Sequence, residues 1–171
     1  NGTPPDENLW ITYSMNKEDM WVSRIPVPVQ DKVTQHVSEV FGQMPAGKEL
    51  NYWNYYSGLW TPVTIEKKDG QKVLALQDWD PFEYARAERV IPSSKKVVAE
   101  FTITPQQSDH GWLDIEFLDA KGSPGVRLSF DSAGNFITKA GYRNRNLMKY
   151  SAGKTYNVRV ELNTMTRFFY V

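Results

Sequence analysis

The feature that most constrains this chain is a succession of short segments with alternating apolar and polar residues, running from Leu59 to Val171. Val97–Thr104 and Tyr156–Leu162 place apolar residues at every second position, which is the period of a strand with one buried face. Asp69-Gly70 is a strong hairpin turn signal. Strands that recur at spacings of about ten residues, with such turns between them, predict an antiparallel β-sandwich or barrel.

The other strands expected in this region follow the same pattern. They are Thr61–Ile65, Lys72–Gln77, Ala85–Ile91, Gly111–Leu118, Val126–Phe130, Asn135–Lys139 and Arg167–Val171. A domain seldom ends on its most apolar strand, because that strand would lack neighbours. Either the last strand closes a sheet or the sandwich continues beyond residue 171, and we favour the second interpretation.

The first third of the chain reads differently. Leu9–Pro28 contains two aromatic and β-branched runs around a polar turn, which predicts a hairpin. An isolated hairpin is marginally stable in water, so these strands are expected to belong to something larger. Gln30–Tyr56 has some apolar residues at helical spacing, but most are poor helix formers, so an irregular linker with a single turn fits equally well. The predicted domains are a hairpin over 1–29, a linker over 30–58 and the sandwich over 59–171.

Composition excludes several classes of function. The 20 basic and 20 acidic residues balance, so the chain lacks the electrostatic signature of a nucleic-acid-binding or membrane-surface protein. There is no cysteine, which excludes disulfides, thiolate metal sites and a cysteine nucleophile. No apolar run approaches the roughly 20 residues of a membrane helix, so we expect no membrane insertion. Aromatic residues make up 13% of the chain, and flat side chains left on a surface suit sugar rings.

Two parts of the sequence resemble known modules. Leu9–Val29 resembles the last propeller strands of sialidase-like proteins of the BNR-repeat type. The region from about Tyr56 to Val171 is similar to the concanavalin A-like, or laminin-G-like, jelly-roll module. The second likeness is carried by four segments, of which the last has the pattern Tyr-x-x-Gly-x-x-Tyr-x-Val. These are Lys72–Asp78, Trp112–Phe117, Val126–Gly134 and Tyr150–Val160.

The resemblance implies a fold, a partner and a location. It implies an all-β, jelly-roll β-sandwich preceded by a hairpin left from a β-propeller. The implied protein is a secreted, periplasmic or cell-surface member of the glycan-degrading machinery of bacteria, with a glycan or polysaccharide as ligand and the propeller part of the same polypeptide as neighbour. It supplies no catalytic residues, because the arginine triad and the acid and nucleophile groups of true sialidases would lie on blades upstream of this chain.

The best enzymatic candidate within the sandwich is the pair Asp114 and Glu116. Residues two apart on a strand point to one face, and glycosidases need two carboxylates at a defined separation. Concanavalin-like glycosidases typically carry Glu-x-Asp-x-x-Glu, whereas this chain has Asp-x-Glu and so departs from the pattern. The competing interpretation is a solvent-facing strand with alternating charge.

Metal and triad chemistry have weaker support. Asp78 and Asp80 lie in one loop and could contribute oxygen ligands to Ca²⁺, but a structural turn is the favoured interpretation of this loop. His36 and His110 are far apart in the sequence and do not form a local zinc or triad motif. No cofactor is therefore expected, with calcium as the alternative.

Sugar recognition is the chemistry that the sequence favours. It needs aromatic rings against the apolar faces of pyranoses and planar polar groups near the hydroxyls. An aromatic cluster and a cationic loop meet these requirements, and arginines of the loop could hold a sugar carboxylate in a bidentate manner. The candidate ligand-binding residues are Trp53, Tyr55, Trp60, Tyr142, Arg143 and Arg145. Interface packing for the cluster and a solvated hairpin tip for the loop are the competing interpretations.

Three hypotheses follow. The chain is a non-catalytic, carbohydrate-associated module of a sialidase-like glycoside hydrolase; or the sandwich is itself a hydrolase or lyase using Asp114 and Glu116; or it is a structural or adhesion domain without a ligand. The second predicts that Glu116 lines a concave face with Trp112. The third predicts that the aromatics near Trp53 and Trp60 are all buried.

Overall fold

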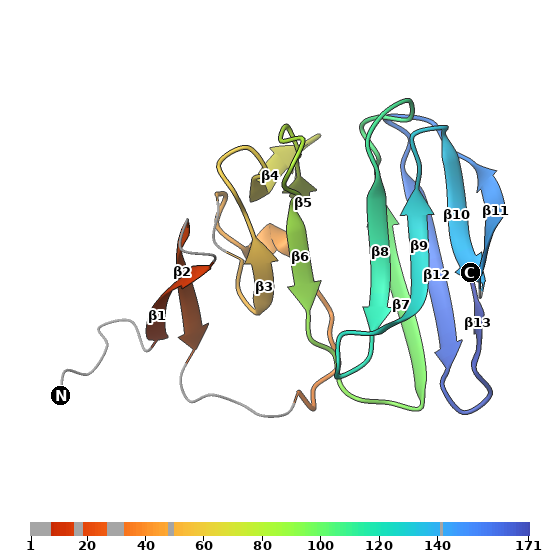
Figure 1. The fold of residues 1–171 in the computed structure, drawn as a ribbon, viewed down its shortest axis with the longest axis horizontal. Coiled ribbons are helices and arrows are strands. Elements are labelled where there is room, and N and C mark those ends of the chain that lie inside the picture. The colour runs from red at the N-terminus through yellow and green to blue at the C-terminus, as the bar shows by residue number, and fades with distance from the viewer. Residues whose placement is uncertain (1–7, 16–18, 27–32, 48–49, 141) are drawn as a thin grey trace. The chain divides into compact units, whose positions relative to one another are not determined.

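The computed structural model describes residues 8–15, 19–26, 33–47, 50–140 and 142–171, and almost every regular element in it is a β-strand (Figure 1). Every strand pairing in the described residues is antiparallel. The predicted all-β, antiparallel fold class is therefore confirmed. The chain forms two compact units, Asn1–Ser93 and Ser94–Val171.

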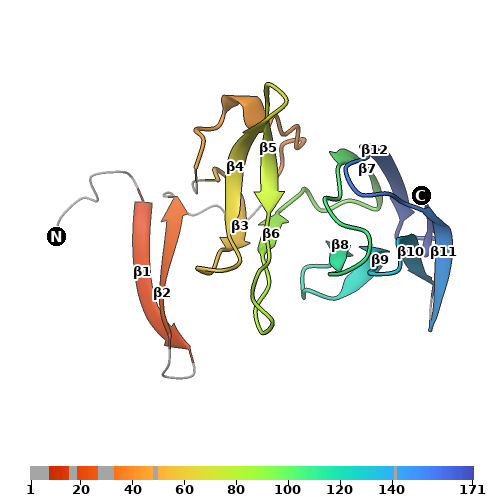
Figure 2. The ribbon, with the colours of Figure 1, turned by 90° about the horizontal axis from the view of Figure 1, so that it is seen from above.

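The second unit is a two-layered sandwich, with β8 to β11 in one sheet and β7, β12 and β13 in the other (Figures 1 and 2). The first sheet has the strand order β11-β10-β9-β8, and the second has the order β13-β12-β7. The strands are β7 (Lys96–Ile103), β8 (Leu113–Leu118), β9 (Pro124–Phe130), β10 (Asn135–Ala140), β11 (Arg143–Lys149), β12 (Tyr156–Asn163) and β13 (Phe168–Tyr170).

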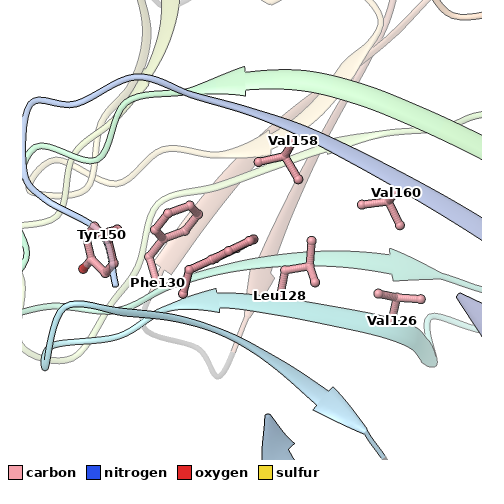
Figure 3. Packing of buried hydrophobic residues seen from close by; sticks show 7 residues of the cluster. Val126, Leu128, Phe130, Tyr150, Val158 and Val160 are labelled. Atoms are coloured by element: carbon pink, nitrogen blue, oxygen red, sulfur yellow. The ribbon is translucent and has the colours of Figure 1, made fainter. Parts of the chain in front are cut away.

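The core of this unit lies between the two sheets. Figure 3 shows apolar side chains of β9 facing those of β12 across the interior. Phe130 stacks on Phe136 with ring centroids 4.5 Å apart and meets Tyr150 edge to face at 4.9 Å. Each fully buried aliphatic or aromatic side chain contributes roughly 1.5–3 kcal/mol by leaving water, so this alternating pattern stabilises the sandwich. The buried cluster consists of Val126, Leu128, Phe130, Phe136, Tyr150, Val158 and Val160.

Aspartate side chains fix the turns at one end of this core. Asp131 Oδ1 accepts backbone N–H bonds from Ala133 at 3.0 Å and from Asn135 at 2.7 Å. The side-chain amide of Asn135 also donates to Asp131, and this bond lowers the pKa of the Asp131 carboxyl below its ordinary value. Tyr150 Oη donates to the backbone carbonyl of Asp131 at 2.7 Å, and burial raises the pKa of this phenol. The β9–β10 turn is thereby attached to the core.

The described part of the first unit contains three small sheets, which pair β1 with β2, β3 with β6 and β4 with β5. The β4–β5 turn is made by Asp69 and Gly70, whose φ angles of 50° and 82° suit a tight two-residue hairpin loop. A second buried cluster, Met44, Leu50, Val63 and Ile65, lies in this unit. The elements are β1 (Asn8–Met15), β2 (Asp19–Pro26), a 3₁₀ turn (Phe41–Gln43), β3 (Trp53–Tyr56), β4 (Val63–Lys68), β5 (Gln71–Leu76) and β6 (Arg86–Arg89).

The structure refines the predicted organisation. The hairpin over 9–28 is present as β1 and β2, although residues 1–7, 16–18 and 27–32 lie outside the described residues. Within the described part of the 30–58 segment, the regular elements are the 3₁₀ turn and β3, so the helical alternative is not adopted there. The strands β4, β5 and β6, which we expected in the sandwich over 59–171, lie in the first compact unit. Among the described residues, no helix is long and apolar enough to cross a membrane.

Candidate functional site

The outer face of the four-stranded sheet carries a hollow of about 330 Å³. Ligand pockets in proteins typically begin at about 300 Å³, so this volume suits a small ligand such as one or two sugar rings. The hollow is lined by Trp112, Asp114, Arg127, Ser129, Ile137, Lys139 and Asn144.

Strand alternation and register bring these residues together. On β8, Leu113 and Ile115 pack toward the core, so Asp114 projects from the opposite face. The β8–β9 register places Asp114 opposite Ser129, and the β9–β10 register places Ser129 opposite Ile137. The next row on the same face begins with Glu116 opposite Arg127. Segments far apart in the sequence therefore contribute neighbouring side chains to one surface.

A network of polar contacts organises the β8–β9 side of the hollow. Asp114 Oδ1 accepts hydrogen bonds from Trp112 Nε1 at 2.7 Å and from Ser129 Oγ at 2.5 Å. The guanidinium of Arg127 pairs with Glu116 at 2.5 Å, and its Nε lies 3.9 Å from Asp114 Oδ2. Both carboxylates are thus engaged with the same arginine, and the indole of Trp112 is fixed through its N–H.

The β10–β11 side of the hollow is open to a ligand. In the part of the chain that the structure describes, neither Lys139 nor Asn144 has a hydrogen bond or an ion pair from its side chain. Trp112 remains 57% exposed although its N–H is bonded. An exposed ring beside an ammonium and a planar amide provides an apolar platform together with donors and acceptors for hydroxyl or carboxylate groups.

A second hollow of similar volume, about 340 Å³, lies on the outer face of the three-stranded sheet, and it has a different character. Arg159 pairs there with Glu161 at 2.8 Å and with Glu100 at 2.5 Å, and these bonds, chiefly the one with Glu161, raise the pKa of its guanidinium. Thr102 Oγ1 donates to Asn157 Oδ1 at 3.0 Å. The aromatic residue of this hollow, Phe101, packs against the core. The polar groups satisfy one another, which leaves little for a ligand.

Comparison with known proteins agrees with a carbohydrate-recognising sandwich. Residues 53–171 match the family model described as "Sialidase-like, CBM domain", where CBM denotes a carbohydrate-binding module. The chain belongs to this sialidase-like CBM family. A solved structure named "Sialidase" is similar to it with a TM-score of 0.89 and 46% sequence identity. The match covers 96% of this chain and 15% of that one, so the chain spans a small part of the related protein. No curated protein matches.

The sialidase-like CBM sandwich places the sequence candidates Asp114 and Glu116 on the outer face of β8. Trp112 and Asp114 line the hollow together. Glu116 does not line it but forms an ion pair with Arg127, which does. Arg127 and Lys139 were missed by the sequence analysis. The signal for Arg127 was present, because the hairpin formed by the two strands around Asp119–Gly122 pairs Glu116 with Arg127.

The predicted cationic loop is a strand. Arg143 and Arg145 belong to β11, where they pair with Ala140 and Thr138 of β10. Alternation places Asn144 on the face of the hollow and both arginines on the other face of the sheet. Tyr142 is fully exposed just before this strand. A ligand role for Tyr142, Arg143 and Arg145 stays a prediction, but they do not line the hollow.

The predicted aromatic cluster is divided by the fold. Trp53 is partly buried, donates from Nε1 to Glu39 at 3.2 Å and lies 6.0 Å from Phe41 between ring centroids. In contrast, Trp60 is 59% exposed and Tyr55 is 39% exposed. Trp53 has the environment of a packing residue, whereas Trp60 is accessible, so the expectation that all these aromatics are buried is not met.

The loop considered for calcium is organised by backbone hydrogen bonds. Asp78 Oδ1 accepts the amide of Asp80 at 3.0 Å, and Asp80 Oδ1 accepts the amide of Phe82 at 2.8 Å. Among the described residues there is no group of three or more His, Cys, Asp or Glu that could hold a metal ion. His110 pairs with its neighbour Asp109, and this contact lowers the pKa of the Asp109 carboxyl. Calcium binding at Asp78 and Asp80 stays an untested alternative.

Proposed function

We propose that this chain is the non-catalytic carbohydrate-binding module of a secreted bacterial sialidase-like glycoside hydrolase, and that it binds its glycan on the outer face of β8–β11. The observation that carries this proposal is the arrangement of Trp112, Lys139 and Asn144 around one hollow. The indole is fixed by Asp114, whereas the ammonium and the amide have no partner among the described residues. The family match supports a glycan as the ligand.

The chemistry of the hollow suggests how a sugar would be held. A pyranose ring would lie against the exposed face of Trp112, and the amide of Asn144 would bond to ring hydroxyls. Arg127 already has two carboxylate partners, but Lys139 has none in the described residues. A sugar carboxylate, as in uronic or sialic acids, would pair with Lys139.

The exposed side chains of the β1–β2 hairpin are an argument that this hairpin packs against another part of a larger polypeptide. Met20 is 77% exposed and Val22 is 61% exposed on β2, so apolar side chains of this two-stranded sheet face solvent. Trp21 of β2 packs on Tyr56 with ring centroids 4.5 Å apart, but exposed apolar surface on the remaining part of a two-stranded sheet is typical of a surface that a further partner covers. We therefore propose that β1 and β2 pack against the propeller of the same polypeptide. The small share of the related sialidase that this chain covers is consistent with this.

The contacts of Asp114 and Glu116 do not favour a hydrolase within the sandwich. A catalytic pair of carboxylates needs access to opposite sides of a glycosidic bond. Here Asp114 is bonded to Trp112 and Ser129, and Glu116 is bonded to Arg127. Through these contacts Asp114 orients the ring of Trp112, and Glu116 orients the guanidinium of Arg127.

A glycan array followed by titration calorimetry tests the proposal. Trp112→Ala should abolish binding to the acidic glycans found on the array. Lys139→Gln should weaken the binding of acidic glycans at least about tenfold, which corresponds to a loss of roughly 1.4 kcal/mol of binding energy. Arg159→Ala is the matched control, because it removes an ion-paired arginine from the outer face of the other sheet. Unchanged binding of acidic glycans in Trp112→Ala would refute the site, and absence of any glycan binding would favour the structural or adhesion hypothesis.

A further inference from the structure

Two exposed tryptophans of the first unit form a pair that the sheet-face site does not use. The β4–β5 register pairs Val63 with Leu76. Backbone hydrogen bonds extend the ladder outward, since the Gln77 amide donates to Pro62 at 3.0 Å and the Trp79 amide donates to Trp60 at 2.9 Å. Trp60 therefore lies directly opposite Trp79.

Residues directly opposite each other in an antiparallel ladder project from the same face, with Cβ atoms about 5.5 Å apart or less. Neighbouring Thr61 is completely buried, as is Val63 two residues further on, so alternation directs Trp60 away from the core. Trp60 is 59% exposed and Trp79 is 66% exposed. Two exposed indoles on the same side of paired loops form a larger apolar surface than a single exposed side chain, and such surfaces are typical of ligand-binding sites.

The groups beside Trp79 are hydrogen-bond acceptors. Asp78 and Asp80 flank it, and each uses Oδ1 to hold the next turn of the loop, at 3.0 and 2.8 Å. In the described residues their Oδ2 atoms have no hydrogen-bond partner, which leaves two fixed carboxylates with free acceptor capacity. Glu83 lies in the same loop, and no Lys or Arg occurs between residues 77 and 85. The local charge is therefore negative.

The two loops are held against each other. The Gly58 amide donates to Thr61 Oγ1 at 3.1 Å. A Cβ at Gly58 would lie 2.6 Å from Glu83 Oε2, so the loop before β4 passes directly beside the loop after β5. A preorganised pair of loops lowers the entropic cost of binding a ligand on its rings.

We propose that Trp60 and Trp79, with the carboxylates of Asp78 and Asp80, form a second saccharide-binding site that accepts neutral, hydroxyl-rich sugars. Aromatic rings accept the apolar faces of pyranoses, and carboxylates accept hydrogen bonds from hydroxyl groups. The same carboxylates repel the uronic or sialic acids that Lys139 would attract. Both tryptophans fall within residues 53–171, the segment that matches the sialidase-like CBM family, which favours a sugar over a protein as the occupant.

The experiment compares variants of the full chain by calorimetry against neutral oligosaccharides of glucose, galactose, mannose and N-acetylglucosamine. Trp60→Ala and Trp79→Ala should each weaken binding at least about tenfold, a loss of about 1.4 kcal/mol, because central aromatic anchors carry most of the binding energy of such a site. Phe82→Ala is the matched control, since Phe82 is 94% exposed in the same loop but has no place in the tryptophan pair. It should bind like the wild type.

Trp112→Ala separates this proposal from the sheet-face site. Binding of neutral sugars that persists in Trp112→Ala and disappears in Trp60→Ala supports the second site. Neutral-sugar binding that survives in the Trp60→Ala, Trp79→Ala double variant overturns it and leaves the sheet-face proposal standing. Failure of all neutral sugars to bind also overturns it. So does a double variant that changes self-association but not sugar binding, since this result would assign the tryptophans to a protein interface. Circular dichroism of each variant verifies the fold.

Discussion

The indole N–H of Trp112 donates to Asp114 Oδ1 at 2.7 Å, and this contact fixes the largest exposed ring of the four-stranded sheet. Asp114 lies on β8, opposite Ser129 of β9, whose hydroxyl donates to the same carboxylate oxygen. The aspartate therefore connects the ring to the central part of the sheet. A ring that is already oriented loses less conformational entropy when a ligand stacks on it.

Asp114→Ala should weaken glycan binding by about three- to tenfold, because the lost hydrogen bond is worth about 1 kcal/mol and the ring becomes free to turn. Asp114→Asn keeps an acceptor oxygen for Trp112 and should retain most of the affinity. Calorimetry with the glycan selected on the array measures both. Equal losses in the two variants would indicate that the charge of Asp114, and not its hold on the ring, matters.

Glu116→Gln should have no effect on glycan hydrolysis, since we assign Glu116 a structural contact with Arg127 and no role in bond cleavage. The wild type and the variant should both release no reducing ends from the glycans that the chain binds. A reducing-end assay after prolonged incubation measures this. Turnover by the wild type that is lost in Glu116→Gln would reinstate the hydrolase hypothesis.

Asp131 should make the second unit sensitive to acid. Its pKa is lowered in the folded state, chiefly by the Asn135 side-chain amide, so its ionised form stabilises the fold. That contribution is fully present above the ordinary Asp value of about 3.9 and is lost as the pH falls through the lower folded value. We expect the wild type to be more stable than Asp131→Asn at pH 6. Urea unfolding between pH 6 and 2.5 should show this difference in the free energy of unfolding becoming smaller as the pH falls. A stability difference that does not change with pH would contradict this role.

Strand positions with one buried face could be predicted from the sequence, and positions without one could not. Tyr156–Leu162 alternates because Val158 and Val160 face the core while Arg159 faces solvent, and β12 was expected at nearly its observed bounds. β11 was mistaken for a loop, because every residue of Arg143–Lys149 is exposed and burial therefore imposes no pattern on its sequence.

The candidate site was predictable only in part, because it depends on pairings between segments. Asp114 and Glu116 share a face by alternation alone, which the sequence analysis recognised. The contribution of Lys139 requires the β9–β10 pairing, a contact between two strands that alternation within one strand does not reveal. The pairing of Trp60 with Trp79 could have been predicted from the sequence. Counting outward from the Asp69-Gly70 turn, one residue at a time along each strand, brings the two tryptophans opposite each other.

Leu128→Ala should destabilise the second unit by about 2–5 kcal/mol, the usual cost of removing a buried leucine and leaving a cavity. Leu128 is completely buried and belongs to the cluster between the two sheets. Val98→Ala is the matched control, because Val98 lies on β7 of the same unit but is 54% exposed, and it should change stability by less than about 1 kcal/mol. Chemical denaturation followed by circular dichroism measures both. If the two variants lost equal stability, the core between β9 and β12 would not be the main source of stability of the sandwich.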